Sequence, residues 1–142
     1  MRFTFDYALR IMKLIASSGG SVSSAECAAA LGIGCSYTRT VLGMLKRHDL
    51  VIGERGQLGG YQLADQPQRI TLLDILKAVD SGIEGAKDAA MRASRDEPRI
   101  DTVIAKADRA YLDVLSRFTV AHLLEPDRMG GSADMRGIGR AS

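Results

Sequence analysis

The chain has 142 residues, of which 46% are hydrophobic and 25% are charged, and its net charge is only +2. This length and composition suit one globular domain with its own core, and they exclude collagen-like and low-complexity chains. No apolar run approaches the roughly 20 residues that cross a bilayer, and the first apolar stretch carries charges and no small-residue cleavage site, so we expect a cytoplasmic protein without a membrane span or signal peptide.

The first helix is predicted over residues 5–16, where apolar side chains recur at intervals of three and four residues. Two serines and two glycines follow directly and end this helix. Ser23, with Glu26 three residues later, predicts a capping box at the start of a second helix that continues to Leu31.

A third helix should follow a short glycine-bearing turn, with Ser36 as its N-terminal cap and its end near His48. Two short helices joined by a tight turn are typical of a helix-turn-helix. Residues 50–63 hold two β-prone runs around a glycine-rich tip, which predicts a β-hairpin, or wing. Residues 70–79 have the pattern of a further short amphipathic helix.

The second half of the chain differs in character. Residues 80–100 combine glycines with many charges, so we expect a linker in which a sensor segment could lie. Residues 101–125 are predicted to form a long helix with a coiled-coil seam, which needs a partner to cover it. The seam consists of Ile104, Ala107, Tyr111, Val114, Phe118 and Ala121. Residues 126–142 contain few apolar groups, and we expect them to be disordered.

Five short motifs follow one another through residues 3–79. They are Asp6-Tyr7-Ala8-Leu9-Arg10, Gly32-Ile33 with Ser36-Tyr37, Leu50-Val51, Arg55-Gly56 with Gly59-Gly60-Tyr61, and Ile70-Thr71-Leu72 with Asp74. In this order they resemble the Rrf2 family of bacterial winged-helix transcription regulators, which includes regulators of iron–sulfur biogenesis and of cysteine metabolism. Beyond residue 79 the resemblance is only architectural.

The resemblance implies a mainly α fold with a small β-hairpin. Residues 1–79 would form a winged helix-turn-helix DNA-binding domain, and the long C-terminal helix would join two copies. We therefore expect a homodimeric, sequence-specific regulator, most simply a repressor, that binds double-stranded DNA at a palindromic operator. The third helix would enter the major groove and the wing the minor groove. A small-molecule or protein effector bound at residues 80–100 could change the spacing of the wings.

The cysteines depart from the family pattern. Metal-sensing members hold an iron–sulfur cluster through three closely spaced cysteines before the long helix, but residues 80–106 contain none here. The two cysteines of the chain are Cys27 and Cys35, so we expect neither a cofactor nor a structural metal site. The alternative left open is a cluster held through unusual ligands such as Cys27, Cys35 or carboxylates. The family's glycine just before the wing is replaced by Asp49, a residue type that tolerates left-handed backbone.

The amino end of the third helix carries small and polar side chains, which can reach base edges in the major groove. Arg39 could bind guanine with two hydrogen bonds, while Ser36, Tyr37 and Thr40 could contact phosphates or bases. The alternative is that Tyr37 packs against the wing and Arg39 is a solvated charge.

Arg55 at the wing tip suits insertion into a narrow minor groove, because flanking glycines let the backbone approach DNA closely. Gly59 and Gly60 belong to this expected contact, and an ordinary hairpin-tip arginine is the alternative. Lys46 and Arg47, at the end of the third helix, could bind phosphates or complement the helix dipole, and both interpretations stay open.

Two other functions compete with DNA regulation. The first is a protein-interaction module that keeps the fold without binding DNA. The second is a redox sensor that acts through Cys35, which should lie in the turn before the third helix, whereas Cys27 should be a buried core residue. No phosphate-binding loop or catalytic motif is present, and neither His48 nor His122 has metal-ligand spacing, so we do not expect an enzyme.

Overall fold

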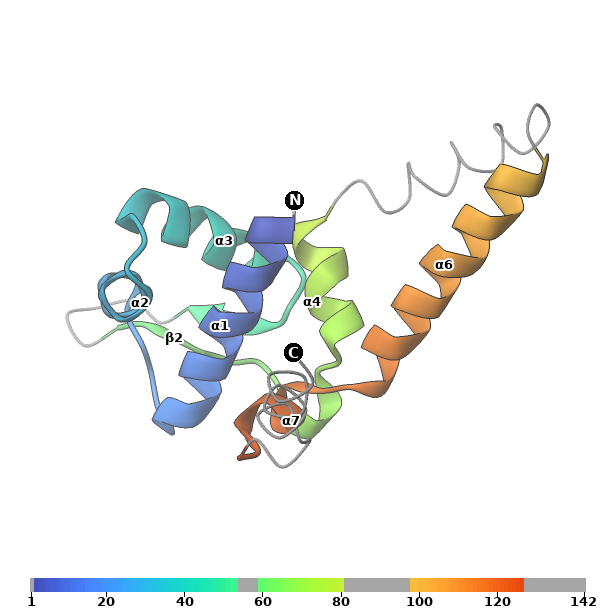
Figure 1. The fold of residues 1–142 in the computed structure, drawn as a ribbon. Helices are drawn as coiled ribbons and strands as arrows, with labels where there is room; N and C mark the ends of the chain where they lie inside the picture. Colours follow the sequence, from blue (N-terminus) through green and yellow to red (C-terminus); the bar gives the residue numbers. More distant parts are fainter. Residues whose placement is uncertain (1, 54–58, 81–97, 127–142) are drawn as a thin grey trace, which may run out of the picture.

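The computed structural model describes residues 2–53, 59–80 and 98–126 (Figure 1). Its central element is helix α1 (Arg2–Ser18), which is longer at both ends than the predicted span. The apolar positions that predicted this helix are all buried, namely Ala8, Ile11, Met12 and Ile15. They pack toward α3, α4 and α7, so α1 joins the helix-turn-helix to the second half of the chain.

Helix α2 (Ser24–Leu31) begins and ends where the sequence predicts. The Ser23 hydroxyl accepts a hydrogen bond from the Glu26 backbone N–H at 3.0 Å, and the Glu26 carboxylate accepts one from the Ser23 N–H at 3.4 Å. This reciprocal capping box is therefore confirmed. The helix ends at Gly32, whose φ of 66° is left-handed and favours glycine.

Helix α3 (Cys35–Arg47) begins one residue earlier than its predicted cap. The N-cap is Gly34, which has extended backbone and no side chain to cap with, so the prediction that Ser36 caps this helix is wrong. Cys35 consequently lies in the first turn of α3 rather than in the preceding turn. After the helix, Asp49 has a φ of 58°, which confirms the expected tolerance of left-handed backbone at this position.

The wing is an antiparallel hairpin of strands β1 (Val51–Gly53) and β2 (Tyr61–Leu63), with Val51 opposite Leu63. Tyr61 also forms a bridge with Val22 in the α1–α2 loop, through hydrogen bonds of 2.7 and 3.0 Å. A Cβ atom on Gly60 would lie 2.8 Å from the backbone carbonyl of Val22. Only glycine lets these two backbones come so close, and this contact fixes the wing beside α2.

After the wing, a 3-10 turn η1 (Pro67–Arg69) leads into helix α4 (Leu72–Val79). The buried apolar side chains of α4 are Leu72, Ile75, Leu76 and Ala78, and they complete the core formed by α1 and α3. Within the described ranges, no helix is both long and apolar enough to cross a membrane.

The predicted long C-terminal helix is two helices, α6 (Pro98–Arg117) and α7 (Val120–Leu124). The Leu72 N–H donates to the Phe118 carbonyl and the Val120 N–H to the Ile70 carbonyl, both at 2.9 Å. These bonds hold Phe118 and Thr119 beside the start of α4, so the helix breaks there. The prediction of one continuous helix through residue 124 is therefore wrong. The last two seam residues, Phe118 and Ala121, lie outside α6.

Candidate nucleic-acid interface

The amino-terminal half of α3 presents a polar face to solvent. Ser36, Arg39 and Thr40 are all exposed, and their spacing places them on neighbouring turns of one side of the helix. Gly43 follows on this side, and no heavy atom lies within 4 Å of the Cβ that a side chain there would have. The face is therefore narrow and open. The sequence motif did not indicate that Gly43 belongs to it.

The polar side chains of this face are partly ordered by their neighbours. Arg39 Nε donates to the hydroxyl of Ser24, at the start of α2, at 3.5 Å. The Thr40 hydroxyl donates to the Ser36 carbonyl at 3.1 Å, which leaves its lone pairs available to other groups. The Ser24 contact keeps the guanidinium of Arg39 near α2 without burying it.

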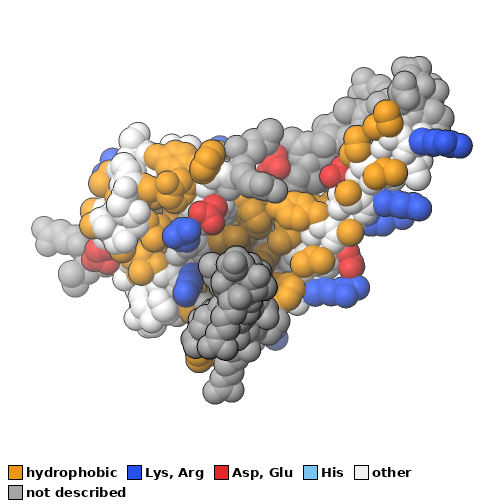
Figure 2. Space-filling model, viewed as in Figure 1, with side chains coloured by type: hydrophobic (Ala, Val, Ile, Leu, Met, Phe, Trp, Pro, Cys, Tyr) orange, Lys and Arg blue, Asp and Glu red, His pale blue; other side chains and the backbone are white. Residues whose placement is uncertain are grey.

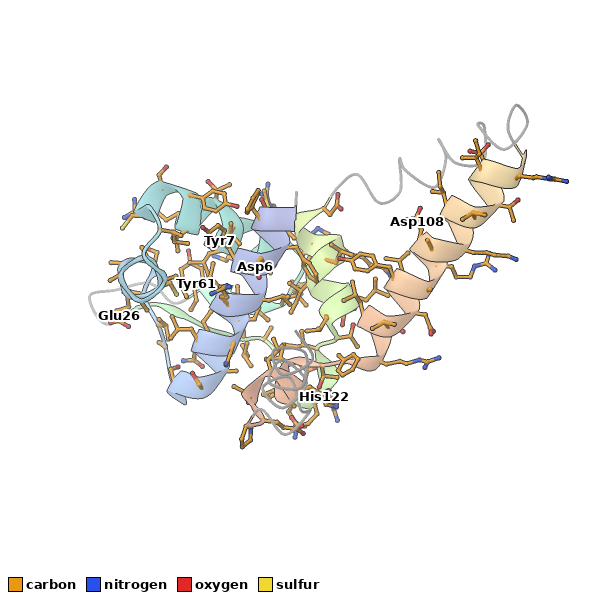
Figure 3. The ribbon with its side chains drawn as sticks, viewed as in Figure 1. Asp6, Tyr7, Glu26, Tyr61, Asp108 and His122 are labelled. Carbon is orange, nitrogen blue, oxygen red and sulfur yellow. The ribbon has the colours of Figure 1, made fainter. Side chains whose placement is uncertain are left out.

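Tyr37 is half-buried and faces α1. Its hydroxyl shares a 2.8 Å hydrogen bond with the Thr4 hydroxyl, and its ring meets the Tyr7 ring edge-on, with centroids 5.6 Å apart. Figure 3 shows Tyr7 between α1 and α3. The alternative that placed Tyr37 against the wing is therefore wrong, because its ring packs on the first helix.

Two further cations lie in the last turn of α3. A Cβ atom on Gly53 would lie 3.2 Å from Lys46 Nζ, so this ammonium group extends across to strand β1 of the wing. Arg47 Nε donates to the Gly43 carbonyl at 3.3 Å. Both positions also place positive charge at the carboxyl end of the helix dipole. His48, the residue that ends α3, is exposed.

The structure describes the base of the wing, whereas the wing tip, residues 54–58, lies outside the described residues. Gly59 is half-buried, whereas Gly60 is buried against the α1–α2 loop. Because Gly60 is buried, it can fix the position of the wing but cannot itself touch DNA. Any effect of Gly60 on DNA binding would therefore be indirect. Arg55 lies outside the described residues, and its expected contact stays a prediction.

The two cysteines have different surroundings. The side chain of Cys27 is fully buried on α2, which confirms the core position predicted for it. Burial, together with the nearby Glu26 carboxylate, raises the pKa of the Cys27 thiol to about 11. This thiol is therefore protonated at neutral pH. Cys35 is exposed in the first turn of α3.

Helix α6 carries an exposed apolar stripe. Figure 2 shows hydrophobic side chains along the side of α6 that faces α4, and Lys and Arg side chains along its outer side. The large exposed residues of the stripe are between 46% and 66% exposed and comprise Ile100, Val103, Ile104, Tyr111 and Val114. Leu115 instead joins the core. Because α6 leans away from α4 toward its amino end, the stripe is left uncovered within the described part of one copy (Figure 1).

Comparison with known proteins gives one consistent result. The model of the Rrf2 family, described as an iron-dependent transcriptional regulator, matches residues 1–126. The HTH-type transcriptional regulator BadM of Rhodopseudomonas palustris is 28% identical over 116 residues, which are 81% of this chain and 74% of that protein. A similar regulator of Mycobacterium tuberculosis is 33% identical over 88 residues, 61% of this chain, and the match spans only about half of that protein, 55%.

A solved structure shares the fold. The structure of IscR from T. potens superposes with a TM-score of 0.71 at 25% identity, covering 85% of this chain and 82% of that chain. A mostly helical domain with a two-stranded antiparallel hairpin is the winged helix expected from the sequence, and this fold prediction is confirmed.

The family description names iron, but this chain lacks a three-cysteine site that could bind an iron–sulfur cluster. The sequence supplies only two cysteines, and one of them, Cys27, is fully buried. Over the described ranges, no three His, Cys, Asp or Glu side chains gather where they could hold a metal ion. The residues present therefore do not fit a cluster bound through three cysteines.

Proposed function

The chain belongs to the Rrf2 family of transcriptional regulators, and from this we propose that it is a homodimeric, sequence-specific DNA-binding repressor that works in the cytoplasm. The observation that carries the proposal is the exposed polar face of α3 beside the wing. A helix with small and polar side chains at its amino end is the element that winged-helix proteins place in the major groove.

The proposed base-reading residues are Ser36, Arg39 and Thr40. Arg39 would bind guanine through its terminal nitrogens, because its Nε is already oriented by Ser24. The open side of α3 at Gly43 lets the helix approach the groove without steric conflict. Ser36 and Thr40 would bind a phosphate or a base edge from the neighbouring turn.

The wing would supply the remaining contacts. Arg55 would enter the minor groove, and Gly59 would let the backbone approach a phosphate. Lys46 lies at the junction of α3 and β1, where its ammonium group could bind a phosphate between the two grooves. Arg47 would add a second phosphate contact.

The apolar stripe of α6 supports a two-fold dimer. Five large apolar side chains, each at least 46% exposed, repeat at helical spacing with Ala107 at the centre. Such a stripe is costly to leave in water, and a second α6 would cover it. A two-fold dimer of reading helices requires a palindromic operator. A small-molecule or protein effector would bind at residues 80–100, of which 81–97 lie outside the described part.

Selection of bound sequences from a random duplex library tests this function. The purified protein, kept anaerobic and reduced at near-physiological salt, should recover a palindrome whose binding weakens steeply as salt rises. Recovery of no motif even at low salt would contradict DNA regulation and favour the protein-interaction module. A partner pull-down would then follow.

A second candidate function rests on the exposure of Cys35 in the first turn of α3. Oxidation of this thiol would place a bulkier, polar group beside Ser36 and obstruct docking on DNA. Mild peroxide should then release DNA from the wild-type protein and leave Cys35→Ser bound. An equal response of both proteins would reject the switch.

A further inference from the structure

We infer that Tyr37 and Thr4 form a positioning contact that sets the orientation of the reading helix on α1, rather than a direct contact to DNA. The inference rests on the proposed DNA-binding function and assigns a role inside it. Their hydroxyl groups are 2.8 Å apart, although the two residues are separated by 33 positions in the chain.

The first turn of α3 has one other buried side chain, Thr38, whose hydroxyl donates locally to the Gly34 carbonyl at 2.9 Å. Its N-cap is Gly34, which offers no side-chain hydrogen bond to the free backbone N–H groups. Ser36 and Arg39, on either side of Tyr37 in sequence, are both exposed. Tyr37 therefore supplies the side-chain hydrogen bond that joins this turn to α1, while Thr38 adds buried packing.

The other end of the contact lies on α1. Thr4 and Tyr7 lie one turn apart on α1, and the Tyr7 ring meets the Tyr37 ring at 81° with centroids 5.6 Å apart. In the next turns of α1, Ala8, Ile11 and Met12 have no exposed surface. The hydroxyl bond thus joins the first turn of α3 to a helix whose inner face is buried in the core.

Base reading is sensitive to such an anchor. Bidentate recognition of a base requires the side chain to be placed within about 0.5 Å and 10–20° of the productive geometry. Contacts to phosphates tolerate more movement and carry little sequence information. Loosening the first turn of α3 should therefore reduce discrimination between sequences more than general affinity for DNA.

The test compares Thr4→Val, Tyr37→Phe and the double variant, each of which removes a hydroxyl and keeps the side-chain volume. Tyr7→Phe is the matched control, because it keeps the ring contact and leaves the Thr4–Tyr37 bond intact. For each protein, the dissociation constant is measured for the selected operator and for a scrambled duplex at the same salt, together with the thermal unfolding midpoint.

We expect Thr4→Val and Tyr37→Phe each to weaken operator binding about fivefold, the net effect of one hydrogen bond, with scrambled-duplex binding unchanged. The double variant should be no weaker than either single variant, since both remove the same bond. Tyr7→Phe should bind as wild type.

Two results would overturn the inference. If Tyr37→Phe weakens both duplexes equally while Thr4→Val binds as wild type, the Tyr37 hydroxyl contacts DNA directly. If the variants lower the unfolding midpoint and keep the wild-type ratio of operator to scrambled affinity, the bond is merely structural. Failure of the wild-type protein to prefer the operator would instead reject the proposed function itself, and that control is measured first.

Discussion

Arg39 shows how one side chain can be exposed and yet oriented. Its Nε donates to Ser24 Oγ at 3.5 Å, while the rest of the guanidinium stays free for another partner. An exposed hydrogen bond of this length contributes little to folding stability. The arrangement therefore adds little to the fold, and under the proposed function it would orient Arg39 for recognition.

Arg39→Ala should relax specificity at one base pair of each half-site. Loss of a bidentate guanine contact removes about 1–3 kcal/mol of discrimination at that position, and other positions should keep their preferences. Competition binding with single-base operator variants measures this, with Arg69→Ala, on the distant η1 turn, as control. A uniform loss of affinity across all sequences would contradict base reading by Arg39.

The buried thiol of Cys27 predicts a pH dependence of stability. Its pKa is raised from 9.0 to about 11 in the folded protein, mainly by burial, so the folded state holds this proton more tightly than the unfolded state. The resulting stability is fully present below pH 9 and is lost as pH rises from about 9 to about 11. Denaturant unfolding should therefore show a steeper decline over this range for wild type than for Cys27→Ala. Equal slopes would contradict the raised pKa.

At the scale of elements, local motifs were predictable and distant contacts were not. The Ser23–Glu26 box spans four residues and was correctly predicted to start α2. The start of α3 was predicted wrongly because Ser36 is a typical cap, whereas the extended backbone at Gly34 already starts the helix. Sequence patterns do not show the bond between Thr4 and Tyr37, since these two residues lie on different helices and are 33 positions apart in the chain.

The break between α6 and α7 has the same kind of cause. The apolar spacing continues through Phe118 and Ala121, so periodicity alone predicts one helix. Pairing of Thr119 with Thr71 interrupts it, and this pairing depends on a segment almost fifty residues earlier in the chain. Exposed polar residues of the candidate site, such as Ser36 and Thr40, were predictable, because helical spacing alone places them on one face.

Two glycines predict opposite effects on stability. Gly60→Ala would bring a Cβ within 2.8 Å of the Val22 carbonyl, which should cost about 1–3 kcal/mol and loosen the wing. Gly43→Ala meets no atom within 4 Å and lies inside α3, so it should stabilise the helix by about 0.5–1 kcal/mol. Thermal unfolding of both variants measures this. A stable Gly60→Ala protein would show that the wing and the α1–α2 loop are not held together as described.

At the scale of the whole molecule, the described residues divide between a packed winged helix and an α6 that extends from it (Figure 1). The core holds α1, α3 and α4 together with Leu115 and Val120, and Leu123 packs against it, so α7 and the carboxyl end of α6 are anchored. The rest of α6 keeps its apolar stripe exposed. This division is compatible with the proposed dimer, in which association of two copies through α6 would place the two α3 helices.

Ala107→Asp should separate the dimer into monomers. The change puts a charge at the centre of the apolar stripe, where a second α6 would bury it without a partner. Ala105→Asp is the matched control, because Ala105 is also exposed but lies on the other side of α6. Light scattering after size-exclusion chromatography measures the mass of each. A dimer that survives Ala107→Asp would show that α6 does not form the interface through this stripe.

Binding measured as a function of half-site spacing shows directly whether a dimer of this protein reads a palindrome. Inserting about five base pairs between the half-sites rotates one by half a helical turn relative to the other. We expect two chains to bind the intact operator together, and we expect the insertion to reduce the affinity to that of a single half-site. Equal affinity for the intact and the interrupted operator would contradict this expectation.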